Sequence, residues 1–192
     1  MNNRKYELTD VTMKFEGRTL YRIRALRNFS DVDTGELGGW VESENNLSQE
    51  GDCWIYDEAK CLDNSRIYDD SMIFDDSIMY DNSKMFGGSA MFDNSKMFGD
   101  SILCNYSSMH HNSEIHDCCA MYDSSIMYNN SKMFGYSKMH GYSEMHDNSQ
   151  MHDYCELHGC SEMWDNSEMY GECKMCDETK ICGNSIVKID IT

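Results

Sequence analysis

Met85-Phe-Gly-Gly-Ser-Ala90, Met97-Phe-Gly-Asp-Ser-Ile102 and Met145-His-Asp-Asn-Ser-Gln150 are three copies of one six-residue unit. The unit repeats from Ile55 to Val187 without insertion or deletion. Its opening residue, which we call position i, is Met, Ile, Leu or Val, with Cys61 as the one exception, and position i+4 is most often Ser. Repetition at a fixed period indicates structural units that stack on one another.

Each unit is predicted to be one short strand followed by a corner. Side chains alternate between the two sides of an extended segment, so position i points inward while i−1 and i+1 point outward. Positions i+2 and i+3 hold mostly Asp, Asn and Gly, which favour turns. A helix is excluded, because a six-residue period advances by about 240° around a helix and forms no apolar stripe.

The pattern of an aliphatic residue at i and a small residue at i+4 resembles the hexapeptide repeat of left-handed parallel β-helices. That resemblance implies an all-β, triangular solenoid with three units, or 18 residues, per coil and about seven coils in this chain. Residues 18 apart would then stack at about 4.8 Å, the usual distance between neighbouring strands. Met, Ile and Leu would form the core, and Ser would line the corners.

Stacking by 18 residues sorts the outward i+1 side chains into three columns, which are rich in aromatic residues and His. Cross-strand contacts between such rings stabilise stacked strands. The first column is Tyr56, Phe74, Phe92, His110, Tyr128, His146, Trp164 and Cys182.

The face that carries this first column is predicted to be the interaction surface. Its i−1 positions are apolar over the first coils, whereas the same positions beside the other two columns include several Lys residues. Large apolar patches on a protein surface usually mark contact sites. The residues predicted to form this interaction face are Trp54, Met72, Phe74, Phe92, Ile126 and Tyr128.

The formal net charge is −18, and most of it belongs to the repeats. Residues 1–50 carry 7 basic and 9 acidic side chains, whereas the remaining residues carry 9 and 25. This acidity disfavours direct binding to nucleic acid or to an anionic membrane. Repeated corner carboxylates leave open that the rod mimics nucleic acid and inhibits a host nucleic-acid-binding or defence protein. The corner carboxylates are Asp57, Asp75, Asp93, Asp147 and Asp165.

Residues 1–50 lie outside the repeat and are predicted to form a small β cap, followed by the solenoid over residues 51–188 and a strand tail over residues 189–192. Thr19–Leu26 alternates apolar and basic residues as a half-buried strand does, and Asp33–Glu42 is typical of a turn and a second strand. A cap would cover the edge of the first coil.

The run Leu20-Tyr-Arg-Ile-Arg-Ala-Leu-Arg27, the segment Gly35-Glu-Leu-Gly-Gly-Trp-Val-Glu-Ser-Glu-Asn-Asn-Leu-Ser48 and Cys53-Trp54 resemble the N-terminal leader of YdcK-like hexapeptide-repeat proteins. The resemblance covers nearly the entire chain. It implies the solenoid fold and an origin in bacteria, phages or prophages, but no established activity.

Catalysis is not expected, because the uninterrupted repeat extrudes no loop that could shape a pocket around a general base. If the chain is an enzyme, the fold makes it an acyltransferase. No cofactor is expected. His140, His158 and Cys176 share one column and are the candidate metal ligands, but three residues in line do not complete a tetrahedron.

The sequence also indicates where the protein works. Met1–Glu7 leads into no apolar signal segment, and no stretch is apolar for long enough to span a membrane. The ten Cys follow the repeat register and are expected to be free thiols in a reducing cytoplasm. The sequence therefore predicts a cytoplasmic, non-enzymatic scaffold that binds a protein partner or itself, with a homo-oligomer expected.

Overall fold

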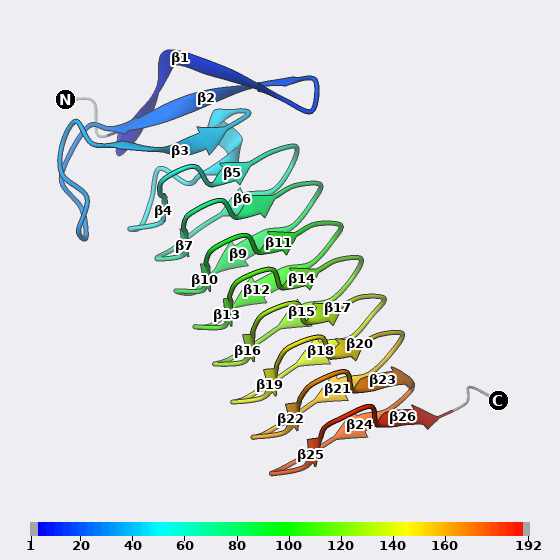
Figure 1. The fold of residues 1–192 in the computed structure, drawn as a ribbon. Helices are drawn as coiled ribbons and strands as arrows, with labels where there is room; N and C mark the ends of the chain where they lie inside the picture. Colours follow the sequence, from blue (N-terminus) through cyan, green and yellow to red (C-terminus); the bar gives the residue numbers. More distant parts are fainter. Residues whose placement is uncertain (1–3, 190–192) are drawn as a thin grey trace.

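The computed structural model describes residues 4–189 and is a parallel β-solenoid whose coils stack one below the other under a β cap (Figure 1). Each coil contributes one short strand to each of three parallel sheets, and partners within a sheet are 18 residues apart, as for Trp54 and Met72. The predicted solenoid and its coil length are confirmed. The β4 sheet has eight strands, so there are about eight coils, one more than expected.

We name the three faces by their first solenoid strand. The β4 face consists of β4 Trp54–Ile55, β7 Met72–Ile73, β10 Ala90–Met91, β13 Ser108–Met109, β16 Ile126–Met127, β19 Glu144–Met145, β22 Glu162–Met163 and β25 Lys180–Ile181. The β5 face consists of β5 Lys60–Cys61, β8 Ile78–Met79, β11 Lys96–Met97, β14 Glu114–Ile115, β17 Lys132–Met133, β20 Gln150–Met151, β23 Glu168–Gly171 and β26 Ile186–Ile189. The β6 face consists of β6 Arg66–Ile67, β9 Lys84–Phe86, β12 Ile102–Cys104, β15 Ala120–Met121, β18 Lys138–Met139, β21 Glu156–Leu157 and β24 Lys174–Met175.

The core is a single column of position-i side chains. Every i residue from Ile55 to Met169 is completely buried, and Met175 is only 5% exposed. Met predominates among them because its unbranched side chain adapts to a narrow interior. The i+4 residues are buried beside this column, so the interior is filled by side chains and holds no channel.

The N-terminal cap is an antiparallel extension of the β5 face. β1 Tyr6–Phe15 pairs with β2 Arg18–Ala25, β2 pairs with β3 Leu37–Val41, and β3 runs parallel to β5. A short 3₁₀ helix, Glu44–Asn46, follows β3 and leads into the first coil. The strand expected over Thr19–Leu26 is found as β2, with Ile23 and Ala25 buried and Arg24 exposed. β1 was not predicted from the sequence.

The cap lies so close to the first coil that two glycines are required in β3. A Cβ atom on Gly39 would lie 2.5 Å from the carbonyl oxygen of Ala59, and one on Gly38 would lie 2.6 Å from that of Ile55. No side chain fits at those distances.

Two expectations keep their status. The left-handed winding remains a prediction from the resemblance. The last strand, expected over Val187–Thr192, is found as β26, and residues 190–192 lie outside the described residues. Within residues 4–189, no helix has the length and apolar character needed to cross a membrane.

Candidate functional site

The outward i+1 side chains form the predicted columns of stacked rings. On the β4 face, ring centroids are 4.5 Å apart for Tyr56 and Phe74 and 4.8 Å apart for Phe74 and Phe92, with planes within 9° of parallel. The same stack continues without a break through His110, Tyr128, His146 and Trp164. The β5 face carries a second stack from Tyr80 to Tyr170.

These stacks determine what the faces present to a partner. Each inner ring is covered on both sides by its neighbours in the column, so the ring faces are occupied and the ring edges point outward. Ring edges carry partial positive charge and favour carbonyl oxygens and apolar groups over a further stacked ring. The stacks therefore suit contact with a polypeptide surface better than stacking on a flat ligand, except at the end of a column.

The β4 face has a continuous uncharged region, which we call the apolar strip. It comprises half-buried side chains over four consecutive coils, and the first charged i−1 residue of this face is Glu144. The other two faces have charged i−1 residues from their first solenoid strands, as at Lys60 and Arg66. The strip consists of Met72, Phe74, Ala90, Phe92, Ser108, His110, Ile126 and Tyr128.

Trp54 was predicted to belong to this interaction face, and that prediction is wrong. Its side chain is completely buried. Phe29 and Tyr6 of the cap pack edge-on against it, with ring centroids 5.3 and 6.2 Å from its own. An outward position in the first coil is thus an inward one relative to the cap, and the exposed strip begins one coil later, at Met72.

The corner aspartates have a structural role in the corners of the solenoid. Asp57, Asp75, Asp93, Asp147 and Asp165 all adopt φ values between 51° and 64°, a left-handed conformation that Asp tolerates better than most residues. Asp75 accepts a hydrogen bond from the backbone N–H of Asp93 at 3.0 Å, and Asp165 accepts one from Gly183 at 2.9 Å. Their carboxylates therefore satisfy backbone donors of the next coil and also border the β4 face with negative charge.

The histidines have carboxylate partners that sequence reasoning did not foresee. His146 Nε2 lies 2.7 Å from a Glu144 carboxylate oxygen, and His158 Nε2 lies 2.9 Å from Glu156. In each pair the two residues flank one position-i residue and therefore project from the same side of one strand. Such pairs can orient a general base, but neither pair lies in an enclosed pocket. His110 instead contacts the hydroxyl of Ser108 at 3.0 Å, and burial lowers the pKa of His110.

The candidate metal ligands remain a linear array. His140 and His158 stack with ring centroids 4.7 Å apart, and Cys176 is exposed one coil further on. Among residues 4–189, no three His, Cys, Asp or Glu side chains are close enough together to hold a metal ion. All ten cysteines are unpaired, and Cys155 and Cys173 are buried in the core.

Comparison with known proteins agrees with the fold. No protein-family model matches the chain. A segment is 40% identical over 63 residues to the "Uncharacterized acetyltransferase YdcK" of Escherichia coli (strain K12). The chain is a partial homologue of this YdcK-like hexapeptide-repeat protein. The match involves 29% of this chain and covers 19% of the relative, well short of its full length, so the relative's named activity does not transfer to this chain by similarity alone.

Proposed function

We propose that this chain is a binding module that holds a partner protein on the apolar strip of its β4 face. The observation that carries this proposal is the contrast between faces of the same solenoid. Side chains at equivalent positions are uncharged on the β4 face from Met72 to Tyr128, whereas Lys96, Glu114 and Lys132 occupy three consecutive i−1 positions on the β5 face. A continuous uncharged surface on an otherwise highly charged rod favours protein contact.

The corners beside the strip favour a particular kind of partner. Asp57, Asp75 and Asp93 repeat along one border, and Asp69 and Asp123 lie on the other. Two copies of the chain placed strip to strip would bring these like charges together. A different protein with an apolar centre and basic residues at its rim would complement both features. Self-association through the strip is the alternative occupant.

The test uses substitutions that the fold already accepts. Glu occupies i−1 positions at Glu144 and Glu162 of the β4 face, so Met72→Glu and Ile126→Glu should fold normally. The matched control is Ile102→Glu, at the i−1 position of the β6 face. We expect affinity capture from the native host to recover a partner with the wild type and the control, and at least about tenfold less with the double variant. Equal recovery by all three proteins would refute the proposal.

The same variants separate the other occupants. Light scattering that gives a dimer for the wild type and a monomer for the double variant would assign the strip to a second copy instead. Mimicry of nucleic acid predicts capture that is lost at high salt and unchanged by the two Glu substitutions. Because the corner carboxylates already serve as acceptors for backbone N–H groups, the acidity has a structural cause that does not require mimicry.

A second candidate function is acyl transfer, which the name of the relative suggests. The observation that favours it is the pairing of His146 with Glu144 at 2.7 Å, since acyl transfer needs an oriented base. Acetyl-CoA would then raise the melting temperature of the wild type, and His146→Ala would abolish acetylation of an acceptor. No thermal shift with acetyl-CoA would count against this function. A reducing cytoplasm and a phage or prophage origin remain part of the proposal, and the ten unpaired cysteines favour the former.

A further inference from the structure

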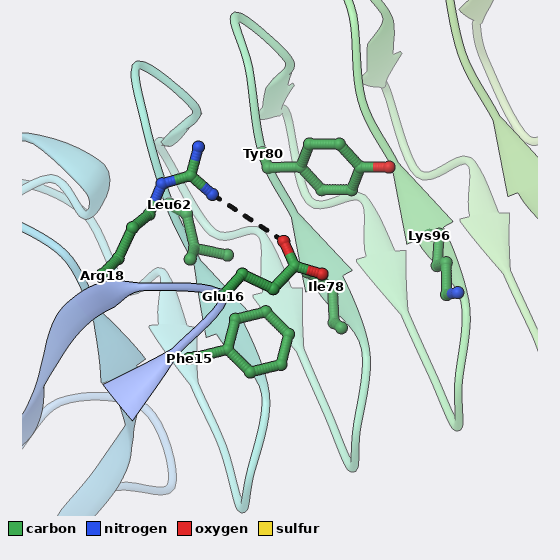
Figure 2. Close-up of a pocket in the computed structure, with 7 residues that line it drawn as sticks. All are labelled: Phe15, Glu16, Arg18, Leu62, Ile78, Tyr80 and Lys96. Carbon is green, nitrogen blue, oxygen red and sulfur yellow. Dashed lines mark ion pairs between the residues drawn. The ribbon is translucent and has the colours of Figure 1, made fainter. Parts of the chain in front are cut away.

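A small cavity lies on the β5 face, beneath the tip of the hairpin formed by β1 and β2 (Figure 2). Its volume is about 130 Å³. Phe15 forms the wall on the hairpin side, and Leu62, Ile78 and Tyr80 form the wall on the solenoid side. The same four side chains border a small apolar cluster centred on Leu20, Leu62 and Trp40, so the inner wall of the cavity is continuous with a packed region.

Tyr80 gives this cavity its chemical character. Tyr80 is the first ring of the β5 column and stacks on Phe98 with centroids 4.7 Å apart. The residue 18 positions earlier is Leu62, so the column has no ring on the other side of Tyr80. This is the place on the β5 face where a planar group can extend a column of rings. Burial raises the pKa of Tyr80 to about 12, so its hydroxyl stays neutral and can donate a hydrogen bond.

The charged groups at the mouth favour an anion. Arg18 is occupied, with its guanidinium 2.7 Å from Asp63 and 3.9 Å from Glu16. Lys96 also lines the cavity and is exposed. Glu114, its partner in the next strand of the sheet, instead binds Lys132 at 3.1 Å. Within residues 4–189, Lys96 has no ion-pair partner, which leaves one positive charge available beside an apolar wall.

We propose that this cavity binds a small aromatic carboxylate, with its ring between Phe15 and Tyr80 and its carboxylate toward Lys96. The volume limits the buried part to about one six-membered ring, since cavities of roughly 150 Å³ lined by aliphatic and aromatic side chains accommodate benzene. The site is separate from the apolar strip, which lies on a different face. It therefore stands or falls independently of the proposed function.

The test is a titration followed by NMR on the full chain with labelled Ile methyl groups. The probes are phenylacetate, the cation phenylethylamine and the non-aromatic acid cyclohexylacetate. We expect phenylacetate to shift the methyl signal of Ile78 through ring currents and to leave Ile102, on the β6 face, unchanged. For so small a ligand the dissociation constant should be about 1 mM. Phenylethylamine and cyclohexylacetate should bind at least about threefold more weakly.

Two variants make the result specific to this site. Lys96→Gln should weaken phenylacetate binding roughly three- to tenfold through loss of one charge-assisted contact, whereas Lys84→Gln, at the i−1 position of the β6 face, should have no effect. Ile78→Phe fills the cavity and should abolish the shift while the remaining spectrum stays native. No shift at Ile78 up to about 20 mM phenylacetate, equal binding of phenylethylamine or cyclohexylacetate, or unchanged affinity in Lys96→Gln would overturn the proposal.

Discussion

The carboxylate of Asp93 accepts a hydrogen bond from the backbone N–H of His111 at 2.9 Å, and the N–H of Asp93 donates to Asp75 at 3.0 Å. One residue therefore links three successive coils along a corner. Its φ of 64° places it in the left-handed region. Asp meets both requirements, because it tolerates that conformation and offers an acceptor on a short side chain.

Replacing Asp93 by Ala should lower the free energy of unfolding by about 2 kcal/mol, through left-handed strain at a residue with a Cβ and loss of one hydrogen bond. Asp93→Asn keeps the conformational preference and an acceptor, so its cost should be below about 0.5 kcal/mol. Urea denaturation measures both changes. Asp76→Ala, at the exposed neighbouring i+3 position, is the control, and a loss there as large as in Asp93→Ala would contradict this explanation.

The same contacts make stability depend on pH. The Gly135 N–H, which donates to Asp117 at 3.0 Å, lowers the pKa of that carboxyl below its ordinary value of 3.8, and His116 contributes in the same direction. A group with a lowered folded pKa stabilises the fold above its ordinary pKa and loses this contribution as pH falls through the folded value. The stability difference between the wild type and Asp117→Asn should thus be constant near neutral pH and shrink below about pH 4. A difference that stays constant down to pH 2.5 would be inconsistent with this.

His110 should show the opposite charge type and the same direction with pH. Its pKa is lowered from 6.5, mainly by burial between Phe92 and Tyr128 and further by His111. The unfolded chain then binds a proton more readily than the folded one, so stability falls as pH drops below 6.5. His110→Phe keeps the ring stack and should remove this part of the loss. The check is the titration of the His110 ring by NMR, together with melting curves of both proteins from pH 7 to pH 5.

Buried serines differ in whether their hydroxyls are satisfied. Ser143 is completely buried, and its oxygen has no hydrogen-bond partner within residues 4–189, whereas Ser101 donates to the Phe98 carbonyl at 2.7 Å. Ser143→Ala should therefore be neutral or stabilise by up to about 1 kcal/mol, because it removes an unpaired polar group. Ser101→Ala should destabilise by about 1 kcal/mol. Thermal denaturation of the two variants distinguishes these outcomes, and identical effects would show that the hydrogen bond does not matter.

The seating of the cap depends on Gly39. A Cβ at this position would approach the Ala59 carbonyl oxygen to 2.5 Å, so Gly39→Ala must displace β3 from the first coil. We expect a loss of more than about 2 kcal/mol and faster proteolysis within residues 4–41, with the lower coils still protected. Leu37→Ala, on the exposed side of the same strand, is the matched control. Uniform proteolysis of the whole chain would instead mean that cap and solenoid unfold together.

The repeats made most of the fold predictable because each unit states its own structure. Period, inward residues and corner residues agree over the whole array, and this consistency is what one sequence can reveal. β1 escaped prediction for a physical reason. Its apolar residues alternate as Tyr6 and Leu8 and then change phase before Met13 and Phe15, because a bulge between Leu8 and Thr12 interrupts the pairing with β2.

The candidate surface was less predictable because it depends on contacts between distant segments. Trp54 obeys the outward pattern of its unit, and only the position of Phe29 in the cap shows that it is covered. The His–Glu pairs, in contrast, could have been found, since Glu144 and His146 flank an inward residue and must lie on one side of the strand. The cavity beneath Phe15 depends on where the hairpin tip lies, and no local pattern encodes that.

The constant 18-residue offset between strand partners, as from Ala90 to Ser108 and from Ser108 to Ile126, gives this protein an adjustable length. Duplicating residues 109–126 would extend the rod by about 4.8 Å and offer every new backbone group a partner of the kind it already has. Adding a single residue would move every later side chain to the wrong side of its strand. Evolution or design can thus set the distance between cap and far end in fixed steps, as on a ruler.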